Sequence, residues 1–231
     1  MTYVMSDLHG VYDRFIAMLE KIDFSDSDEL FIIGDIIDRG ERPVDILEYV
    51  MDKPNITVLL GNHEVMARDL LSRLTTEITE ENINSVDDDF LIELSIYKRN
   101  GGATTMKQLR ALPPIKRKEI IDFIDSLYAY EAIDIGDKTF VLVHAGLGNF
   151  RKDKKISEYS LYELLELRPD YERQYFDDDS VYIVSGHTPT KLISGKWEIY
   201  HSHNNIVIDC GAAFGGRLAC LRLEDMAEFY V

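Results

Sequence analysis

The sequence lacks any hydrophobic run that could cross a membrane, and it is short of positive charge. No stretch approaches the ~18 consecutive apolar residues typical of a transmembrane helix, so we expect no membrane partner. Lysine and arginine together number 25, against 42 aspartate and glutamate residues, and the formal net charge is -17. General binding to a phosphate backbone needs basic surfaces, so this composition argues against a general nucleic-acid-binding protein.

Cysteine is also scarce, and the N-terminus shows no targeting features. Cys210 and Cys220 lie in apolar segments, with neither the spacing of a zinc site nor that of a disulfide framework. The first residues, "MTYVMSDLHG", contain no basic region and no long apolar core of the kind found in signal peptides. We therefore expect a cytoplasmic protein with reduced, buried thiols.

What the sequence does contain is the alternation of an α/β protein. The length of 231 residues and the 45% hydrophobic content suit a single domain spanning residues 1–231. In the first third, the apolar strands "TYVM", "LFII" and "NITVLL" are each followed by a polar loop and an amphipathic helical pattern. Three such units predict right-handed crossovers and a largely parallel sheet with helices on its faces.

The second half adds further strands. The pattern predicts a hairpin around Gly136–Asp137, a helix in "EYSLYELLELR" and a strand in "VYIVS". The tail "NNIVIDCGAAFGGRLACLRLED" predicts two closing strands. Residues 75–127 interrupt the alternation: an acidic stretch typical of a helix or a loop precedes two predicted helices separated at Pro113–Pro114. This segment is too short for a good core of its own, so we interpret it as a helical insertion over the sheet.

Polar motifs follow five of the predicted strands: "SDLHG", "GDIIDRG", "GNHE", "HAG" and "GHT". In a parallel sheet these strand ends meet at one edge, where ligands bind. An aspartate after a strand is usually only a turn residue or a helix cap. However, four of the six histidines fall inside these five motifs, which favours a shared site. The donors that the motifs offer are Asp7, His9, Asp35, Asn62, His144 and His187.

This donor set indicates a pair of metal ions. Mixed nitrogen and oxygen donors suit manganese, iron or zinc better than calcium, which prefers oxygen alone. Six donors are too many for one tetrahedral ion and are enough for two ions if Asp35, from a central strand, bridges them. Two ions about 3.5–4 Å apart can hold a phosphoryl group and activate water for its displacement. His201 and His203, in "YHSHNN", favour a loop or an edge strand instead.

In this order, the five motifs resemble those of the phosphoprotein phosphatase family of calcineurin-like metallophosphoesterases. The resemblance runs from residue 5 to about residue 216 and includes "IDCGAAFGG". Ser6 departs from it, because the family usually has glycine before the first aspartate. The resemblance implies an α/β calcineurin-like fold, a central β-sandwich of mixed sheets flanked by helices, with the helical insertion around 75–127.

The resemblance also implies a role for each candidate residue. Asp7, His9 and Asp35 would hold the first ion, and Asp35, Asn62, His144 and His187 the second; manganese is expected, with iron or zinc as alternatives. His63 would be the general acid and Asp38 its orienting carboxylate. The substrate phosphate would be bound by Asn62, Arg39 and a second arginine, for which Arg168 matches the context better than Arg151.

The resemblance implies a metal-dependent phosphomonoester hydrolase that uses a hydroxide bound to both metals as its nucleophile. The first hypothesis is a serine/threonine protein phosphatase acting on phosphorylated proteins or peptides. The alternative is a symmetrical dinucleoside tetraphosphate hydrolase, such as one for diadenosine tetraphosphate, for which residues 75–127 could form a nucleoside pocket. A small-molecule or RNA-end phosphatase is a third possibility, and a non-catalytic protein should have lost some of these residues.

Overall fold

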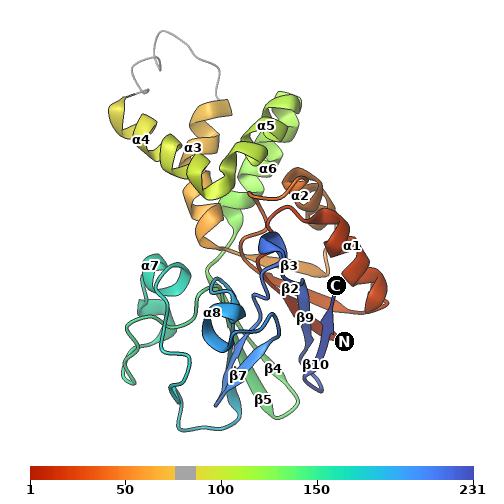
Figure 1. The fold of residues 1–231 in the computed structure, drawn as a ribbon, viewed down its shortest axis with the longest axis vertical. Helices are drawn as coiled ribbons and strands as arrows, with labels where there is room; N and C mark the ends of the chain where they lie inside the picture. Colours follow the sequence, from red (N-terminus) through yellow and green to blue (C-terminus); the bar gives the residue numbers. More distant parts are fainter. Residues whose placement is uncertain (76–86) are drawn as a thin grey trace.

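Two five-stranded mixed sheets pack against each other and are flanked by helices (Figure 1). The computed structural model describes residues 1–75 and 87–231, without the side chains of Asp69 and Thr75. The strand orders are β10-β9-β1-β2-β3 in the first sheet and β4-β5-β6-β8-β7 in the second. This arrangement confirms the predicted sandwich of mixed sheets.

The first sheet contains the three strand–loop–helix units of the predicted alternation. Strand β1 pairs in parallel with β2, and β2 with β3, while β9 and β10 extend the other edge in antiparallel pairs. The strands are β1 (Thr2–Met5), β2 (Glu29–Ile33), β3 (Ile56–Leu59), β9 (Ala219–Arg222) and β10 (Ala227–Tyr230). The carboxyl ends of β1, β2 and β3 therefore lie side by side.

The second sheet brings later motifs to the same edge. The predicted hairpin is confirmed by the antiparallel pair β4–β5, and β5, β6 and β8 run parallel to one another. The strands are β4 (Tyr130–Ile135), β5 (Lys138–Val143), β6 (Val181–Ser185), β7 (Tyr200–Ser202) and β8 (Asn205–Val207). Backbone hydrogen bonds link neighbouring loops at this edge within each sheet. In the first sheet the Asp7 N–H donates to the Gly34 carbonyl (3.1 Å), and in the second sheet the Gly186 N–H donates to the His144 carbonyl (2.7 Å).

Alternating side chains of the strands build two separate cores. On β1, Val4 faces the second sheet, where it shares a core with Phe140 and Val184, all of them fully buried. Its neighbours Tyr3 and Met5 face the helices instead. This period of two is the pattern expected of strands covered on both faces. Burying each large apolar side chain contributes about 1.5–3 kcal/mol.

Helices cover the outer face of the first sheet, and short helices accompany the second. Helix α1 buries Phe15, Met18 and Leu19 at helical spacing, and α2 begins at Pro43, where proline needs no N–H partner. The longer helices are α1 (Tyr12–Lys21), α2 (Pro43–Met51), α3 (Asn62–Thr75), α4 (Asp88–Tyr97), α5 (Ala103–Ala111) and α6 (Pro114–Ser126). The shorter elements are η2 (Lys98–Gly102), η3 (Ile156–Glu158), α7 (Leu161–Leu165), α8 (Thr190–Ser194) and η4 (Ala212–Phe214).

The predicted insertion is helical in its described part. Helix α3 packs against α4 and α6, and together with α5 these helices stand above the first sheet (Figure 1). The predicted break at Pro113–Pro114 separates α5 from α6. Most of the acidic stretch that begins the insertion lies outside the described residues. Within the described ranges, no helix is long and apolar enough to cross a membrane.

The predictions for the second half need correction at two points. The helix expected over residues 158–168 is a single turn, α7, because Ser160 caps its start by accepting from the Glu163 N–H (3.3 Å) and the chain turns away after Leu165. Strand β10, a short edge strand, was not predicted. His201 lies on the edge strand β7, and both cysteines are buried and free, as expected.

Candidate metal centre

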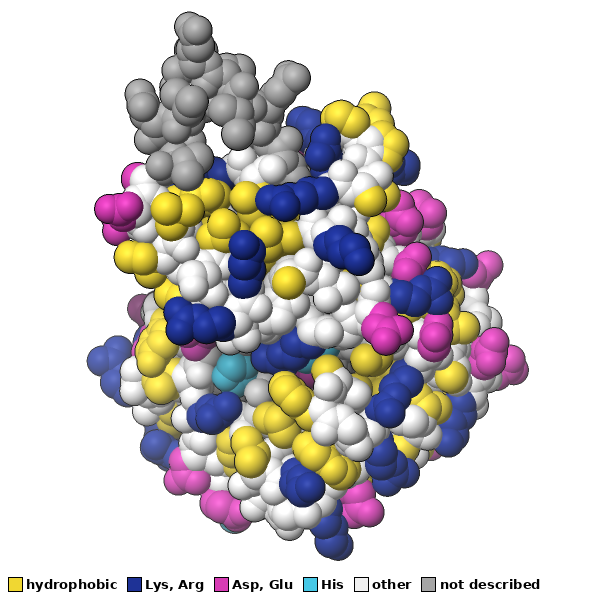
Figure 2. Space-filling model, turned by 45° about the horizontal axis from the view of Figure 1, so that its top comes forward, with side chains coloured by type: hydrophobic (Ala, Val, Ile, Leu, Met, Phe, Trp, Pro, Cys, Tyr) yellow, Lys and Arg dark blue, Asp and Glu magenta, His cyan; other side chains and the backbone are white. Residues whose placement is uncertain are grey.

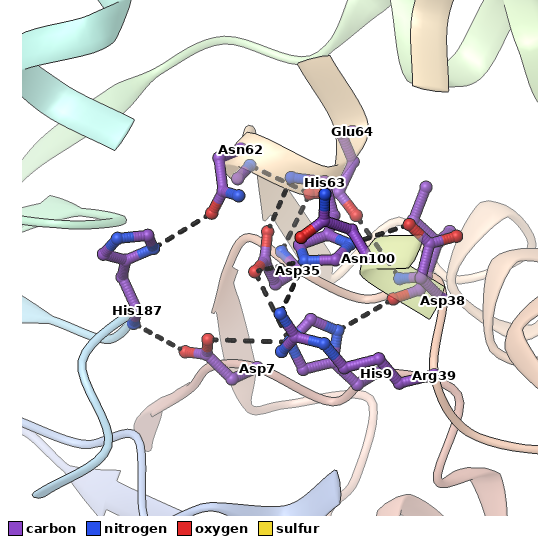
Figure 3. A network of polar contacts seen from close by, with 12 residues as sticks. Asp7, His9, Asp35, Asp38, Arg39, Asn62, His63, Glu64, Asn100 and His187 are labelled. Carbon is purple, nitrogen blue, oxygen red and sulfur yellow. Dashed lines mark hydrogen bonds and ion pairs between the residues drawn. The ribbon is translucent and has the colours of Figure 1, made fainter. Parts of the chain in front are cut away.

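All six predicted metal donors lie along one rim, formed by the loops after β1, β2, β3, β5 and β6; we call this the strand-end rim. Figure 3 shows several of these side chains converging from different loops. Gly61 and Gly186 permit the convergence. A Cβ atom at Gly61 would lie 2.2 Å from Asp35 Oδ1, and one at Gly186 would lie 2.2 Å from Asp7 Oδ2. No larger residue fits at either position.

The backbone of the rim adopts an unusual conformation. Among the described residues, ten non-glycine residues have a positive φ, and six of these ten are predicted site residues. Such conformations cost roughly 1–3 kcal/mol each and persist where the surroundings fix them, commonly at functional sites. The six residues are Asp7, His9, Asp35, Asp38, Arg39 and His187.

Asp35 lies at the centre of the cluster, as its predicted bridging role requires. Its Oδ2 is 3.4 Å from His9 Nε2, and its Oδ1 is 3.5 Å from His144 Nε2. Two groups of donors, each lying within 4.8 Å of one another, share this carboxylate. One is Asp35 with His144 and His187; the other is Asp35 with His9 and His63.

Asp7 lies at the edge of this arrangement. Its Oδ1 is 4.0 Å from His9 Nε2, and its Oδ2 accepts a 3.0 Å hydrogen bond from the His187 N–H. The compact donor group around His9 thus contains Asp35 and His63, whereas the sequence predicts Asp7 as the third donor to this ion. Asp7 keeps one carboxylate oxygen directed at the cluster, so its predicted role remains compatible with the geometry.

Backbone carbonyls fix the orientation of two of the histidine rings. His9 Nδ1 donates to the Ile37 carbonyl at 2.9 Å, and His144 Nδ1 donates to the Ile33 carbonyl at 2.8 Å. In both rings Nε2 is then the nitrogen that could bind a metal, the usual arrangement around histidine ligands. Since His144 follows β5 and Ile33 ends β2, the second bond also ties the two sheets together.

Asn62 completes the donors of the second predicted ion. Its Oδ1 lies 3.0 Å from His144 Nε2 and 2.9 Å from His187 Nδ1. Asn62 begins α3 directly after β3, whereas the two histidines come from the other sheet. This half of the cluster therefore exists only when the two sheets are packed together.

The electrostatics of the cluster fit divalent cations. Burial lowers the pKa of His9 and of His187 to about 3, so both rings are neutral, as metal ligands must be. Burial opposes a charge on His144, but the Asp35 carboxylate raises its pKa to about 10. Burial and the nearby Asp7 hold the pKa of Asp209 well above its usual range. Burial opposes the charge of Asp35, but His144 holds the pKa of this carboxyl well below its usual range. Metal binding would release the proton of His144 and leave neutral imidazoles around the negative charge of Asp35, an environment that a bound cation stabilises.

The predicted acid pair is intact. His63 Nδ1 donates to Asp38 Oδ2 at 2.7 Å, and both side chains are fully buried. Burial alone would lower the pKa of His63, but Asp35 and the hydrogen bond to Asp38 raise it above its usual value. The raised pKa favours the protonated form that a general acid needs, and Nε2 faces the cluster 3.9 Å from Asp35 Oδ2.

Two of the predicted arginines reach the site. Arg39 Nη2 donates to His63 Nε2 at 2.8 Å, and Nη1 contacts His9 Nε2. Arg168 lines the pocket beside the cluster, where its Nε donates to Thr188 Oγ1 at 3.1 Å. The less favoured candidate Arg151 is not among the pocket residues and pairs with Asp153 (3.9 Å) on an exposed loop. The geometry thus favours Arg168 as the second phosphate-binding arginine.

The pocket beside the cluster has a volume of about 470 Å³ and an unexpected apolar side. Figure 2 shows basic and histidine side chains in a hollow across the middle of one face, with hydrophobic side chains next to it. The apolar side comes from α8, η4 and the segment between α8 and β7, and only Asn100 comes from the insertion. The outer wall of the pocket, as we call it, consists of Pro189, Lys191, Leu192, Trp197 and Phe214.

Glu64 is a buried residue to which the sequence analysis assigned no role. Its Oε2 accepts from the N–H groups of Asp35 (2.8 Å) and Gly61 (2.9 Å). Its Oε1 accepts from those of Ile36 (2.9 Å) and Ile37 (3.3 Å). Burial and the neighbouring Asp35 raise its pKa to about 7. Glu64 therefore joins two loops of the rim, and its only signal in the sequence is its place in "GNHE".

Comparison with known proteins identifies the family. The sequence model of the calcineurin-like phosphoesterase family matches residues 2–220, so the chain belongs to this family of metallophosphoesterase hydrolases. This result confirms the resemblance found in the motifs. Members of the family typically bind two divalent metals, and the His/Asp groups described above are able to hold them.

Individual proteins resemble this chain in sequence or in structure. The chain is 27% identical over 258 residues to bis(5'-nucleosyl)-tetraphosphatase PrpE [asymmetrical] of Geobacillus thermodenitrificans, covering 99% of this chain and 92% of the relative. A solved protein provisionally named a diadenosine tetraphosphatase superposes with a TM-score of 0.67 at 15% identity, covering 100% and 92% of the two chains. A serine/threonine phosphatase from Saccharomyces cerevisiae, similar to human phosphatase PP5, gives a TM-score of 0.57 at 14% identity, covering 100% and 78%. These structural matches establish the fold alone.

Proposed function

We propose that this protein hydrolyses dinucleoside tetraphosphates, cleaving one phosphoanhydride bond with water. The observation that carries the proposal is the pocket of about 470 Å³, which joins the predicted metal ligands Asp35, Asn62 and His187 to the outer wall. A substrate that fills this pocket needs a phosphate chain at one end and a flat, largely apolar group at the other. A nucleotide has both parts.

The outer wall has the chemistry to hold a nucleoside. Leu192 is 69% exposed and Phe214 is 53% exposed, although both lie beside a charged site. The Lys191 ammonium lies 5.0 Å from the ring centre of Trp197. Stacking of a base on an aromatic side chain contributes about 1–3 kcal/mol. A base placed between these side chains would cover apolar surface that otherwise faces water.

The rim would perform the cleavage. Arg39 and Arg168 would bind phosphate oxygens through paired N–H donors and offset their charge. When bound, the two divalent ions would supply Lewis acidity and activate the attacking water. That water's oxygen joins one phosphorus atom, the P–O bond on the far side breaks, and the departing nucleotide keeps the bridging oxygen. His63 would donate a proton to that oxygen.

The mixed donor set supports manganese as the proposed ion, with iron and zinc as the alternatives. The relative from Geobacillus thermodenitrificans supports the substrate class, because its name specifies a bis(5'-nucleosyl)-tetraphosphatase. That name also specifies asymmetrical cleavage, whereas the alternative hypothesis from the sequence was a symmetrical enzyme. We propose asymmetrical cleavage on this ground, with one nucleoside triphosphate and one monophosphate as products.

The first hypothesis from the sequence, a serine/threonine protein phosphatase, is the competing function. The rim would serve it equally well, because a phosphoserine ester presents the same phosphoryl group. The outer wall favours the dinucleotide, since a phosphorylated serine or threonine has no flat apolar group next to its phosphate. The match to the yeast phosphatase is one of fold and supplies no argument about substrate.

A parallel assay tests the proposal. The manganese-loaded protein is incubated with diadenosine tetraphosphate and with a set of phosphoserine and phosphothreonine peptides, and products are separated by anion-exchange chromatography. We expect a higher kcat/KM on the dinucleotide, with ATP and AMP as products. Two ADP molecules would indicate symmetrical cleavage. A higher kcat/KM on the peptides would overturn the proposal in favour of a protein phosphatase.

A further inference from the structure

The carboxylate that orients the predicted acid is itself held by two hydroxyl groups. Asp38 Oδ2 accepts from His63, while Oδ1 accepts from the Tyr97 hydroxyl at 2.7 Å and from Thr105 Oγ1 at 2.6 Å. Thr105 Oγ1 accepts in turn from the Asp38 N–H at 3.0 Å. Asp38 and Thr105 are fully buried, and Tyr97 is 1% exposed. Each carboxylate oxygen thus has a donor that fixes its direction.

Both hydroxyl groups come from the helical insertion. Tyr97 ends α4 and Thr105 lies in the first turn of α5, and the π-helical turn η2 joins the two helices. Asp38 precedes these residues by 59 and 67 positions in the chain. In Figure 3 the loop that carries Asp38 and Arg39 passes close to Asn100 of this turn. The insertion therefore reaches the loop that carries the predicted acid machinery.

The turn between the helices is shaped to fit this contact. Gly101 has φ +103°, a conformation that L-residues rarely adopt, and its carbonyl accepts from the Arg39 N–H at 3.1 Å. A Cβ atom at Gly101 would lie 2.6 Å from Arg39 Cγ, and one at Gly102 would lie 2.4 Å from the ring of Tyr97. The same turn thus fixes the backbone of Arg39 and the ring of Tyr97.

We propose that the helical insertion is a positioning element for catalysis, in which Tyr97 and Thr105 hold Asp38 so that His63 keeps one orientation, with Nε2 toward the leaving oxygen. If His63 were its only partner, the Asp38 carboxylate could rotate about its Cβ–Cγ bond, and the His63 ring would rotate with it. Two donors on the second oxygen remove that freedom. Neither Tyr97 nor Thr105 touches the reacting atoms, so both act through Asp38 and His63.

This positioning role is independent of the natural substrate. It rests on His63 acting as the acid in a metallophosphoesterase, and it applies to the cleavage of any phosphate ester or anhydride. It also differs from a packing role. Packing needs only the ring of Tyr97 and the methyl group of Thr105, whereas positioning needs their two hydroxyl groups.

The test removes the hydroxyl groups and keeps the shapes, with Tyr97→Phe and Thr105→Val. Each variant is assayed on aryl phosphates whose leaving groups cover a range of basicity. A positioned acid matters most when the leaving oxygen is basic, so we expect kcat to fall about tenfold on the most basic leaving group, with KM unchanged. On 4-nitrophenyl phosphate, whose leaving group needs little protonation, the loss should be less than about twofold.

Three controls separate positioning from folding. Thr105→Ser keeps the hydroxyl group and should restore most of the activity. Thr139→Val removes a similar bond, from Thr139 Oγ1 to Asp134 Oδ1 (2.6 Å), on the exposed β4–β5 hairpin, and should leave all rates unchanged. In a His63→Asn background, Thr105→Val should cause no further loss, because both changes act through the same proton donor.

The outcomes that would overturn the proposal are specific. Equal losses on all leaving groups would point to packing, and so would a full further loss in the His63→Asn background. Unchanged rates in both hydroxyl variants would show that Asp38 needs no partner from the insertion. Should Thr105→Val fail to fold, Tyr97→Phe decides between these outcomes, because it keeps the whole ring in place.

Discussion

The strand-end rim and the outer wall meet in one pocket, but they are built in opposite ways. The rim consists of charged and polar groups that are almost completely buried, such as Asp35, His63 and His144. Apart from Lys191, the outer wall consists of apolar and aromatic groups, among which Leu192 and Phe214 are exposed. The rim is rigidly fixed by backbone hydrogen bonds and supplies a chemistry that suits many phosphate compounds. We expect the outer wall to determine which phosphate compound binds in the pocket.

The largest effect is expected from a substitution of Asp35, at the centre of the rim. Asp35→Asn keeps the shape of the side chain and removes the charge shared by both donor groups. We expect bound metal to be lost and kcat to fall by at least about 10³-fold, because the ions contribute several kcal/mol to the reaction. Metal content by mass spectrometry and turnover are measured together. Asp45→Asn, on the surface of α2, is the control, and wild-type turnover in Asp35→Asn would refute the two-ion centre.

A smaller effect should follow from changing the residue that joins two loops of the rim. Each Glu64 oxygen accepts from two backbone N–H groups. In Glu64→Gln an NH2 group replaces one of these oxygens, so it faces two N–H donors in either orientation of the amide. We expect metal affinity to weaken about 10- to 100-fold, as is common when the partners of ligands are altered. Titration of the metal-free protein with Mn²⁺ measures this, with the exposed Glu48→Gln as control. Unaltered affinity would mean that the loops hold their positions without Glu64.

A third effect, confined to substrate binding and turnover, is expected where the rim meets the outer wall. Arg168→Ala should raise KM and lower kcat/KM about 10- to 100-fold, because a hydrogen bond between charged groups contributes about 1.5–3 kcal/mol. Arg151→Ala removes the same charge from an exposed loop and should change nothing. Steady-state kinetics on one substrate compares them. A larger loss in Arg151→Ala would transfer the phosphate-binding role to that residue.

The sequence was sufficient to predict the rim, because each of its donors directly follows an apolar strand. Parallel strands end at a common edge, so Asp7, Asp35 and His144 are recognisable without a structure. Glu64 was harder to recognise, since its partners are backbone N–H groups that a sequence does not display. Tyr97 and Thr105 had no local signal at all, because they meet Asp38 only after α4 and α5 have packed over the sheet.

The outer wall was also missed, for a similar reason. Residues 75–127 were predicted as a segment that could form a nucleoside pocket, but the apolar side of the pocket comes from residues 189–214. Its members are single residues in loops and short helices, with no periodic pattern to distinguish them. Their common feature is their position beside the rim, and that position depends on how the second sheet packs against the first.

Trp197 provides the most direct test of the claim that the outer wall binds a nucleoside. It is the only tryptophan of the chain, so the intrinsic tryptophan fluorescence reports on this wall alone. The measurement is a titration of the metal-free protein, which consumes no substrate, with diadenosine tetraphosphate and with inorganic tripolyphosphate. We predict that the dinucleotide quenches the fluorescence at concentrations up to about millimolar, as expected for a base stacked on or near the indole, and that tripolyphosphate does not. No change with the dinucleotide, or equal quenching by both compounds, would contradict the account.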